Sequence, residues 1–193
     1  MNHYDFFIRR PIDLRTGIRV ITSVILLTLL TASMMPAQTS AGYGQQIFVM
    51  IKLMPSIKSI GIISNNVTET FTQATARAGL PFGIKVFVAK ADKPKDIPEL
   101  YHMLLKKGIK IIWLPDKDDA MLLNMGFEYL RETTLEDKIG LCVPVSKMVS
   151  EGALCCVQID GNKLIVYINK RVAQVIGVNI LDDPTGQVKY VLK

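Results

Sequence analysis

Three carboxylates follow one short apolar run closely enough to form part of a binding site. The run spans residues 111–114 and ends at Pro115, and Asp116, Asp118 and Asp119 come directly after it. Consecutive apolar residues bounded by a charge and a proline are typical of a strand buried on both faces, as in a parallel sheet covered by helices. Ligands of open α/β proteins bind outside the carboxyl ends of such strands. The sequence therefore predicts a ligand-binding edge at this point.

Polar side chains also follow other predicted strands. We expect the site to be formed by hydroxyls, amides and one carboxylate at the strand ends: Ser64, Asn65, Asn66, Asp116 and Ser146. Helix N-termini at this edge could face the carboxylate of an amino-acid-like zwitterion, and Asp116 its amine. Each residue also has a purely structural interpretation, because serine and asparagine form turns and Asp118 or Asp119 could cap a helix.

The sequence favours neither an enzyme nor a metal site. No nucleophile has a base at reachable spacing, and no glycine-rich phosphate loop follows the first predicted strand. The two histidines, His3 and His102, give no metal-ligand pattern. The acidic pair that a phosphoacceptor domain needs after its first strand is also missing. We therefore expect a protein that is not an enzyme and needs no metal or other cofactor.

The three cysteines are Cys142, Cys155 and Cys156. An odd number with two adjacent members does not form the disulfide framework of a small secreted domain. Neighbouring residues on a strand point to opposite faces, so only one of Cys155 and Cys156 could reach Cys142. Buried free thiols are the expectation, and a bridge to Cys142 in an oxidising compartment is the alternative.

The first 41 residues differ in character from the rest of the chain. Arginines at positions 9, 10, 15 and 19 precede an uncharged run at residues 20–35, and small residues follow up to Ala41. This order is typical of a secretory signal peptide. We expect cleavage after Ala41 and a periplasmic or secreted protein. The alternative is an uncleaved anchor in the inner membrane, although the run is shorter than the roughly 20 residues of a full span.

The charge of the remaining domain is mildly positive. Of 23 basic and 17 acidic residues, four arginines and two aspartates lie in the first 41 positions, which leaves a net charge of +4. The basic residues are spread along the chain and are not interleaved with aromatic residues, as they would be on a nucleic-acid-binding surface. We expect no nucleic acid partner, and membrane contact only through the N-terminal segment.

Residues 42–193 alternate strand-like and helix-like patterns and show no internal domain boundary. After a helix at 44–54, strands are predicted at 57–64, 82–89, 109–114 and 138–143, with helices between them at 67–78, 97–107 and 120–131. The expected elements that follow are a short helix at 146–150, strands at 153–159 and 163–167, a helix at 170–176 and a strand-like end. This order predicts a single α/β domain with three layers, in which helices flank a mostly parallel sheet with right-handed crossovers.

Four segments in this domain resemble a known family. They are MIKLMPSIKSIGIISNN, IKIIWLPDKDD, CVPVSKMVSEGAL and VYINKRVAQVIGVNI, at residues 50–66, 109–119, 142–154 and 166–180. Together they are similar to the C-terminal half of ABC-transporter substrate-binding proteins of the tryptophan/tyrosine-binding kind. That family has, in the same order, a P-x-(I/V)-K-x-(I/V)-G strand entry, a P-T-D strand exit, a V-x-x-G-A-L turn and an N-x-x-x-A-x-x-x-G helix.

The resemblance covers residues 45–181 and implies a single lobe of a type 1 periplasmic-binding-protein-like fold. In that fold two α/β lobes close on a small ligand, and no counterpart of the first lobe precedes Pro55 here. Asp116 keeps the acidic residue of the strand exit, but Lys117 follows it. The resemblance implies a single-lobe relative that binds an amino-acid-like molecule or a partner at the carboxyl edge of its sheet.

The alternative function is that of a non-catalytic accessory subunit of an envelope complex, without a small-molecule ligand. The partners that these two interpretations imply are an ABC permease, another envelope protein or a second copy of the chain. The sequence leaves open which ligand or partner is bound, and whether Cys142 forms a disulfide.

Overall fold

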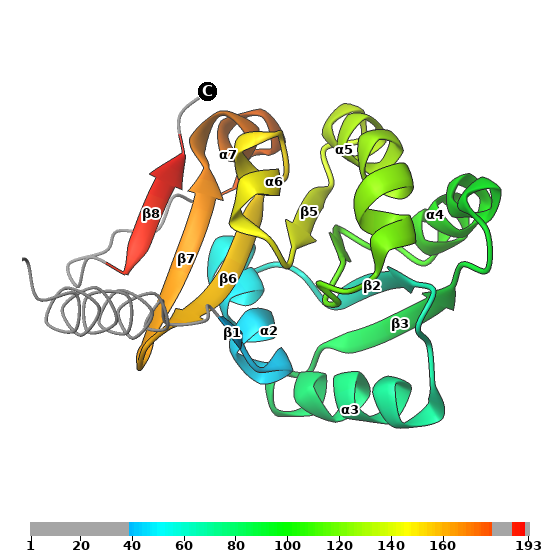
Figure 1. The fold of residues 1–193 in the computed structure, drawn as a ribbon, viewed down its shortest axis with the longest axis horizontal. Helices are drawn as coiled ribbons and strands as arrows, with labels where there is room; N and C mark the ends of the chain where they lie inside the picture. The colour runs from blue at the N-terminus through cyan, green and yellow to red at the C-terminus, as the bar shows by residue number, and fades with distance from the viewer. Residues whose placement is uncertain (1–38, 179–186, 192–193) are drawn as a thin grey trace, which may run out of the picture. The chain divides into compact units, whose positions relative to one another are not determined.

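The computed structural model describes residues 39–178 and 187–191. In these ranges the chain forms one sheet with helices on both faces (Figure 1). The strands are β1 (Thr39–Ser40), β2 (Ser59–Ser64), β3 (Lys85–Lys90), β4 (Ile111–Trp113), β5 (Gly140–Val143), β6 (Cys155–Asp160), β7 (Lys163–Asn169) and β8 (Val188–Val191). The predicted leader lies outside the described residues, except for its last three positions.

The sheet is mostly parallel. Its strand order is β3-β2-β4-β5-β6-β7-β8, and the first five of these strands all run in the same direction. β7 turns back antiparallel to β6, β8 runs parallel to β7, and β1 pairs antiparallel with the end of β6. The predicted α/β class with helices on both faces of a mostly parallel sheet is confirmed.

Helices cover both faces of the sheet. They are α2 (Tyr43–Leu53), α3 (Glu69–Gly79), α4 (Ile97–Lys106), α5 (Phe127–Glu136), α6 (Ser146–Ser150) and α7 (Lys170–Ile176), with short turns η1 (Leu80–Phe82), η2 (Pro94–Asp96) and η3 (Met121–Gly126). Helices α2, α3 and α7 pack in one apolar cluster, and α4, α5 and α6 pack in the other. In the described ranges, no helix is long and apolar enough to cross a bilayer.

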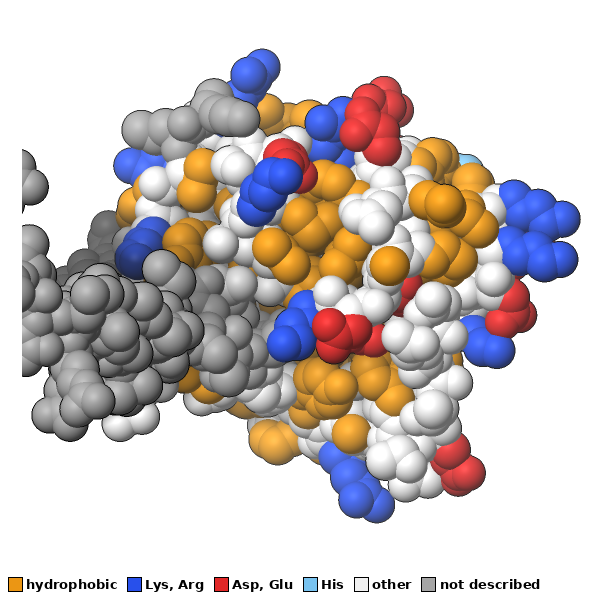
Figure 2. All heavy atoms as spheres, in the orientation of Figure 1, with side chains coloured by type: hydrophobic (Ala, Val, Ile, Leu, Met, Phe, Trp, Pro, Cys, Tyr) orange, Lys and Arg blue, Asp and Glu red, His pale blue; other side chains and the backbone are white. Residues whose placement is uncertain are grey.

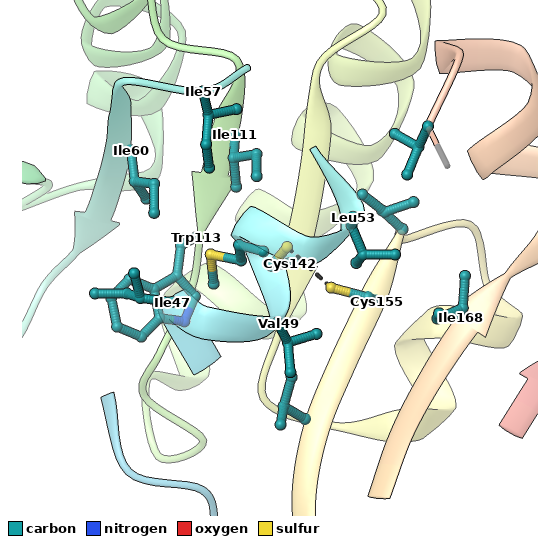
Figure 3. Close-up of a cluster of buried hydrophobic side chains, with 14 of the residues drawn as sticks. Ile47, Val49, Leu53, Ile57, Ile60, Ile111, Trp113, Cys142, Cys155 and Ile168 are labelled. Carbon is teal, nitrogen blue, oxygen red and sulfur yellow. Dashed lines mark hydrogen bonds between the residues drawn. The ribbon is translucent and has the colours of Figure 1, made fainter. Parts of the chain in front are cut away.

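Strand β4 shows why helices must cover both faces of the sheet. Ile111 and Trp113 enter the cluster under α2, which Figure 3 shows, whereas Ile112 and Leu114 enter the cluster under α4 and α5. Alternate residues of a strand face opposite sides, so an uninterrupted apolar run requires a helical layer on each side. The short run that the sequence marks as a buried strand is therefore an interior strand, which lies between β2 and β5.

The helix predicted at residues 120–131 differs from the observed one. It begins as a π-helical turn, η3, and continues as α5 to Glu136. A Cβ atom at Gly126 would lie 2.6 Å from the Cδ1 atom of Ile97, so glycine permits a close approach between η3 and the start of α4. The turn follows directly on the loop after β4, which carries the candidate site.

Candidate functional site

Asp119 joins the carboxyl ends of β2 and β4. Its Oδ2 atom accepts hydrogen bonds from Ser64 Oγ at 3.1 Å and from the backbone N–H of Asn65 at 2.9 Å. Its Oδ1 atom accepts the backbone N–H of Leu122 at 3.0 Å, which caps the helix that follows. Asp119 is 2% exposed. Of the two aspartates that the sequence offered as a helix cap, Asp119 performs this role, and it does so as a buried structural group.

Asp116 occupies the outer part of the same edge. Its Oδ2 atom accepts a hydrogen bond from Asn66 Nδ2 at 2.8 Å, and its Oδ1 atom accepts the backbone N–H of Asp118 at 2.8 Å. The backbone N–H of Asn66 donates to Ser64 Oγ at 3.1 Å. The structure therefore brings together four of the five predicted site residues. Asp116 is the only carboxylate among these four, and it is partly exposed.

Ser146, the fifth predicted residue, lies elsewhere along the edge. It is the first residue of α6 after β5, and it is partly exposed. Of the described residues that line the hollow beside Asp116, none belongs to α6. The structure places Ser146 at a strand end, as predicted, but does not bring it to the other four residues.

A hollow of about 300 Å³ lies between the loop after β4 and the start of α2. It is lined by Ala41, Tyr43, Gln46, Phe71, Pro115, Asp116, Lys117 and Asp118. The Tyr43 ring meets the Phe71 ring edge to face, with centroids 5.9 Å apart, and meets the Trp113 ring in the same way at 5.6 Å. Edge-to-face contacts fix ring orientation, so the aromatic wall is pre-formed.

Sequence reasoning missed the aromatic wall. Tyr43 lies just before the helix predicted at residues 44–54, and Phe71 lies within the helix predicted at 67–78. Both belong to helices that cover the sheet, and nothing in their spacing shows that they reach its carboxyl edge. The available signal was an aromatic residue in the first turn of each helix, at the end that faces the strand termini.

Tyr43 and Asp116 are electrostatically linked. Burial raises the pKa of the Tyr43 hydroxyl above its ordinary value, and the negative charge of Asp116 raises this pKa further. Both effects disfavour the charged tyrosinate. The hydroxyl therefore remains protonated at neutral pH and is available as a hydrogen-bond donor beside a carboxylate.

A buried amide connects α2 to the sheet beneath the hollow. Trp113 Nε1 donates to Gln46 Oε1 at 2.9 Å, and Gln46 Nε2 donates to the carbonyl oxygen of Ala41 at 2.7 Å. Both side chains are buried. Predicted cleavage after Ala41 would release this residue with the leader, and Gln46 Nε2 would then lose its acceptor. Cleavage at this point stays a prediction.

Two buried side-chain oxygens lie near the strand ends. Asn65 Oδ1, after β2, and Gln158 Oε1, in β6, have no hydrogen-bond partner within the described part of the chain. The amide nitrogen of Gln158 does donate to the carbonyl of Pro144, at 3.2 Å. Buried polar atoms are usually paired, but neither residue lines the hollow beside Asp116, so we do not assign these oxygens to the site.

A larger hollow, of about 430 Å³, lies at the opposite edge of the sheet, among α5, the end of α6 and α7. Arg131, which lines this hollow, forms salt bridges with Glu128 at 2.6 Å and with Glu132 at 3.0 Å. We favour the smaller hollow as the candidate site, because the polar strand ends and the aromatic wall converge on it and because ligands of α/β sheets bind at the carboxyl edge.

The comparisons with known proteins show the fold. No family model matches the chain, and no curated protein matches it in sequence. One similar solved structure is a conserved domain protein from Vibrio cholerae O1 biovar eltor, with a TM-score of 0.64 and 17% identity. Another is an ABC domain in complex with L-Trp from Streptococcus pneumoniae, with a TM-score of 0.65 and 18% identity.

Each alignment covers 78% of this chain and 60% of the other protein. The chain therefore spans less than two thirds of the length of these neighbours. Both neighbours share the α/β fold of this chain. At these identities the likeness concerns the fold and not the ligand.

Proposed function

We propose that this domain binds a small amino-acid-like molecule in the hollow beside Asp116. The observation that carries the proposal is the meeting of an aromatic wall, formed by Tyr43 and Phe71, with a partly exposed carboxylate at the carboxyl edge of the sheet. A neighbour of the same fold is in complex with L-Trp, which supports a small-molecule ligand.

Asp116 has the capacity to hold an amine. Each carboxylate oxygen can accept about two hydrogen bonds. Each Asp116 oxygen accepts one hydrogen bond from within the described part of the chain, from Asn66 and from the Asp118 backbone. A site therefore remains on each oxygen for an ammonium group, and these charge-assisted bonds are among the stronger ones in proteins. The existing two bonds hold the carboxylate in place before a ligand arrives.

The hollow is open to solvent on one side. Its volume, about 300 Å³, lies at the lower end of the range for small-molecule pockets. We propose that a second body covers the exposed side and that the isolated chain binds weakly. An ABC permease, another envelope protein or a second copy could supply that body. An envelope partner would fit the periplasmic or secreted location that we propose from the N-terminal segment.

Calorimetric titration of the full chain against single amino acids and their analogues tests this proposal. We expect aromatic or aliphatic amino acids to bind and analogues without the amine to bind more weakly. Asp116→Asn removes the charge with little change in shape, and it should weaken binding by roughly 10–100-fold, the effect of losing a charge-assisted hydrogen bond. Asp160→Asn, an exposed change outside the hollow, is the matched control and should bind as the wild type does.

The alternative, an accessory subunit without a small-molecule ligand, predicts a different result. Figure 2 shows several separate apolar areas between charged side chains on the face viewed, which a protein partner could contact. Large exposed apolar residues occur on α2, η1 and η3, among them Phe48, Leu80 and Met125, and none of these lines the hollow in the described structure. No heat of binding with any compound, together with co-purification of an envelope protein, would overturn the ligand-binding proposal.

A further inference from the structure

Two of the three thiols face each other across neighbouring strands. Cys142 in β5 and Cys155 in β6 are direct partners in the parallel register, and their Sγ atoms lie 3.1 Å apart (Figure 3). Adjacent strands are about 4.8 Å apart, which falls within the Cα separation that disulfides span. Closing the gap to a bond of about 2.05 Å needs only a small rotation of the side chains.

Cys156 lies on the other side of the sheet. Its register partner is Val143, and its side chain belongs to the cluster under α4, α5 and α6, whereas Cys142 and Cys155 belong to the cluster under α2. A bond from Cys142 to Cys156 would require one of them to pass through the sheet. The geometry thus selects one pairing among the three that three thiols allow.

We propose that Cys142 and Cys155 form a disulfide when this domain folds in an oxidising compartment. The two thiols lose two protons and two electrons as the S–S bond forms, and an incoming disulfide of a protein or a small molecule is reduced to two thiols in exchange. Cys156 remains a free, buried thiol on the opposite face.

The bond must form before the sheet is complete. Cys155 is fully buried and Cys142 is 2% exposed. The hydrogen bond with Cys142 and burial both raise the pKa of the Cys155 thiol well above its ordinary value, so the attacking thiolate is scarce in the folded protein. An oxidant therefore reacts with the unfolded or partly folded chain, and the finished bond is protected from reductants.

Refolding the denatured full chain in a buffer of reduced and oxidised glutathione tests the pairing. After the product is denatured again, thiol titration should find one free cysteine. Tryptic mapping should join the peptide of residues 139–147 to that of residues 148–163, and alkylation of the free thiol should mark Cys156 in the second peptide. Cys156→Ala should retain the link, and Cys155→Ala should lose it. If Cys155→Ala does not fold, the Cys156→Ala protein and the peptide map decide the question. Three free thiols, a glutathione adduct at Cys155 or a bond to Cys156 would overturn the proposal.

The bond should also have a measurable effect on stability. A disulfide that closes a short loop restricts the unfolded chain, and for cysteines separated by 13 positions we expect the melting temperature to rise by roughly 6–12 °C. The comparison is between oxidised and reduced Cys156→Ala protein, in which no other thiol competes. Equal melting temperatures would contradict a native pairing.

Discussion

Replacing Asp119 by alanine should destabilise the domain far more than the same change at Asp118. Asp119 is buried and accepts three hydrogen bonds, from Ser64, Asn65 and the backbone of Leu122. Asp118 is exposed and contributes its backbone, not its side chain, to the hydrogen bonds of the described structure. The two residues are adjacent, equal in charge and identical in side chain, so Asp118→Ala is a matched control.

The expected loss at Asp119 is about 3–5 kcal/mol. The helix cap on Leu122 contributes about 1 kcal/mol. Each hydrogen bond to the charged Oδ2 contributes about 1.5–3 kcal/mol, and the buried Ser64 hydroxyl would be left without this acceptor. Asn65 is partly exposed, so water can replace part of its bond, which lowers the sum. For Asp118→Ala we expect a change within about 0.5 kcal/mol.

Urea denaturation followed by tryptophan fluorescence measures the difference. Trp113 is the only tryptophan in the chain and is fully buried, so its emission reports the loss of the core. With a slope of about 2 kcal/mol per molar urea, Asp119→Ala should lower the midpoint by roughly 1.5–2.5 M. A shift equal to that of Asp118→Ala would refute the assignment of Asp119 as the structural link between β2 and β4.

Two further substitutions test the interior. Gln46→Ala should destabilise the domain by about 1–3 kcal/mol, because it leaves the indole N–H of Trp113 and the carbonyl of Ala41 without their partners. A urea midpoint equal to that of the wild type would contradict this prediction. Tyr101 donates to Asp137 at 2.7 Å, and burial first, then this bond, raises its pKa well above its ordinary value. The unfolded tyrosine ionises near pH 10 while the folded one stays protonated, so stability should fall above about pH 10, by up to about 1.4 kcal/mol per pH unit. Tyr101→Phe should flatten this alkaline decline in urea midpoints measured at several pH values, and an unchanged slope would contradict the reasoning.

Much of the local structure could be predicted because its causes are local. Thr68 caps α3 and Asn169 caps α7 through side-chain hydrogen bonds to the backbone three residues on. Gly177 ends α7 with a φ of 72°, a conformation that glycine adopts without strain. The short helix at Ser146–Ser150 matches its predicted bounds. Each of these features depends on a few neighbouring residues, so the sequence carries the signal.

The candidate site was only half predictable from the sequence. The rule that parallel strands end at one edge brought Ser64, Asn65, Asn66 and Asp116 to the same place, because strand direction follows from the alternation of strands and helices. The rule could not distinguish distances along that edge, so Ser146 was grouped with residues that it does not approach. The rule also could not show that Asp119 is buried and that the neighbouring Asp118 is exposed.

The sequence by itself determined the class of fold, the buried strand before Pro115 and the polar character of the strand ends, because apolar runs and turn residues act over short range. Only the tertiary structure decided that Tyr43 and Phe71 form the wall opposite Asp116 and that Cys142 faces Cys155. These pairings depend on how whole helices and strands pack against one another. That packing is a property of the assembled core, and no short stretch of the chain records it.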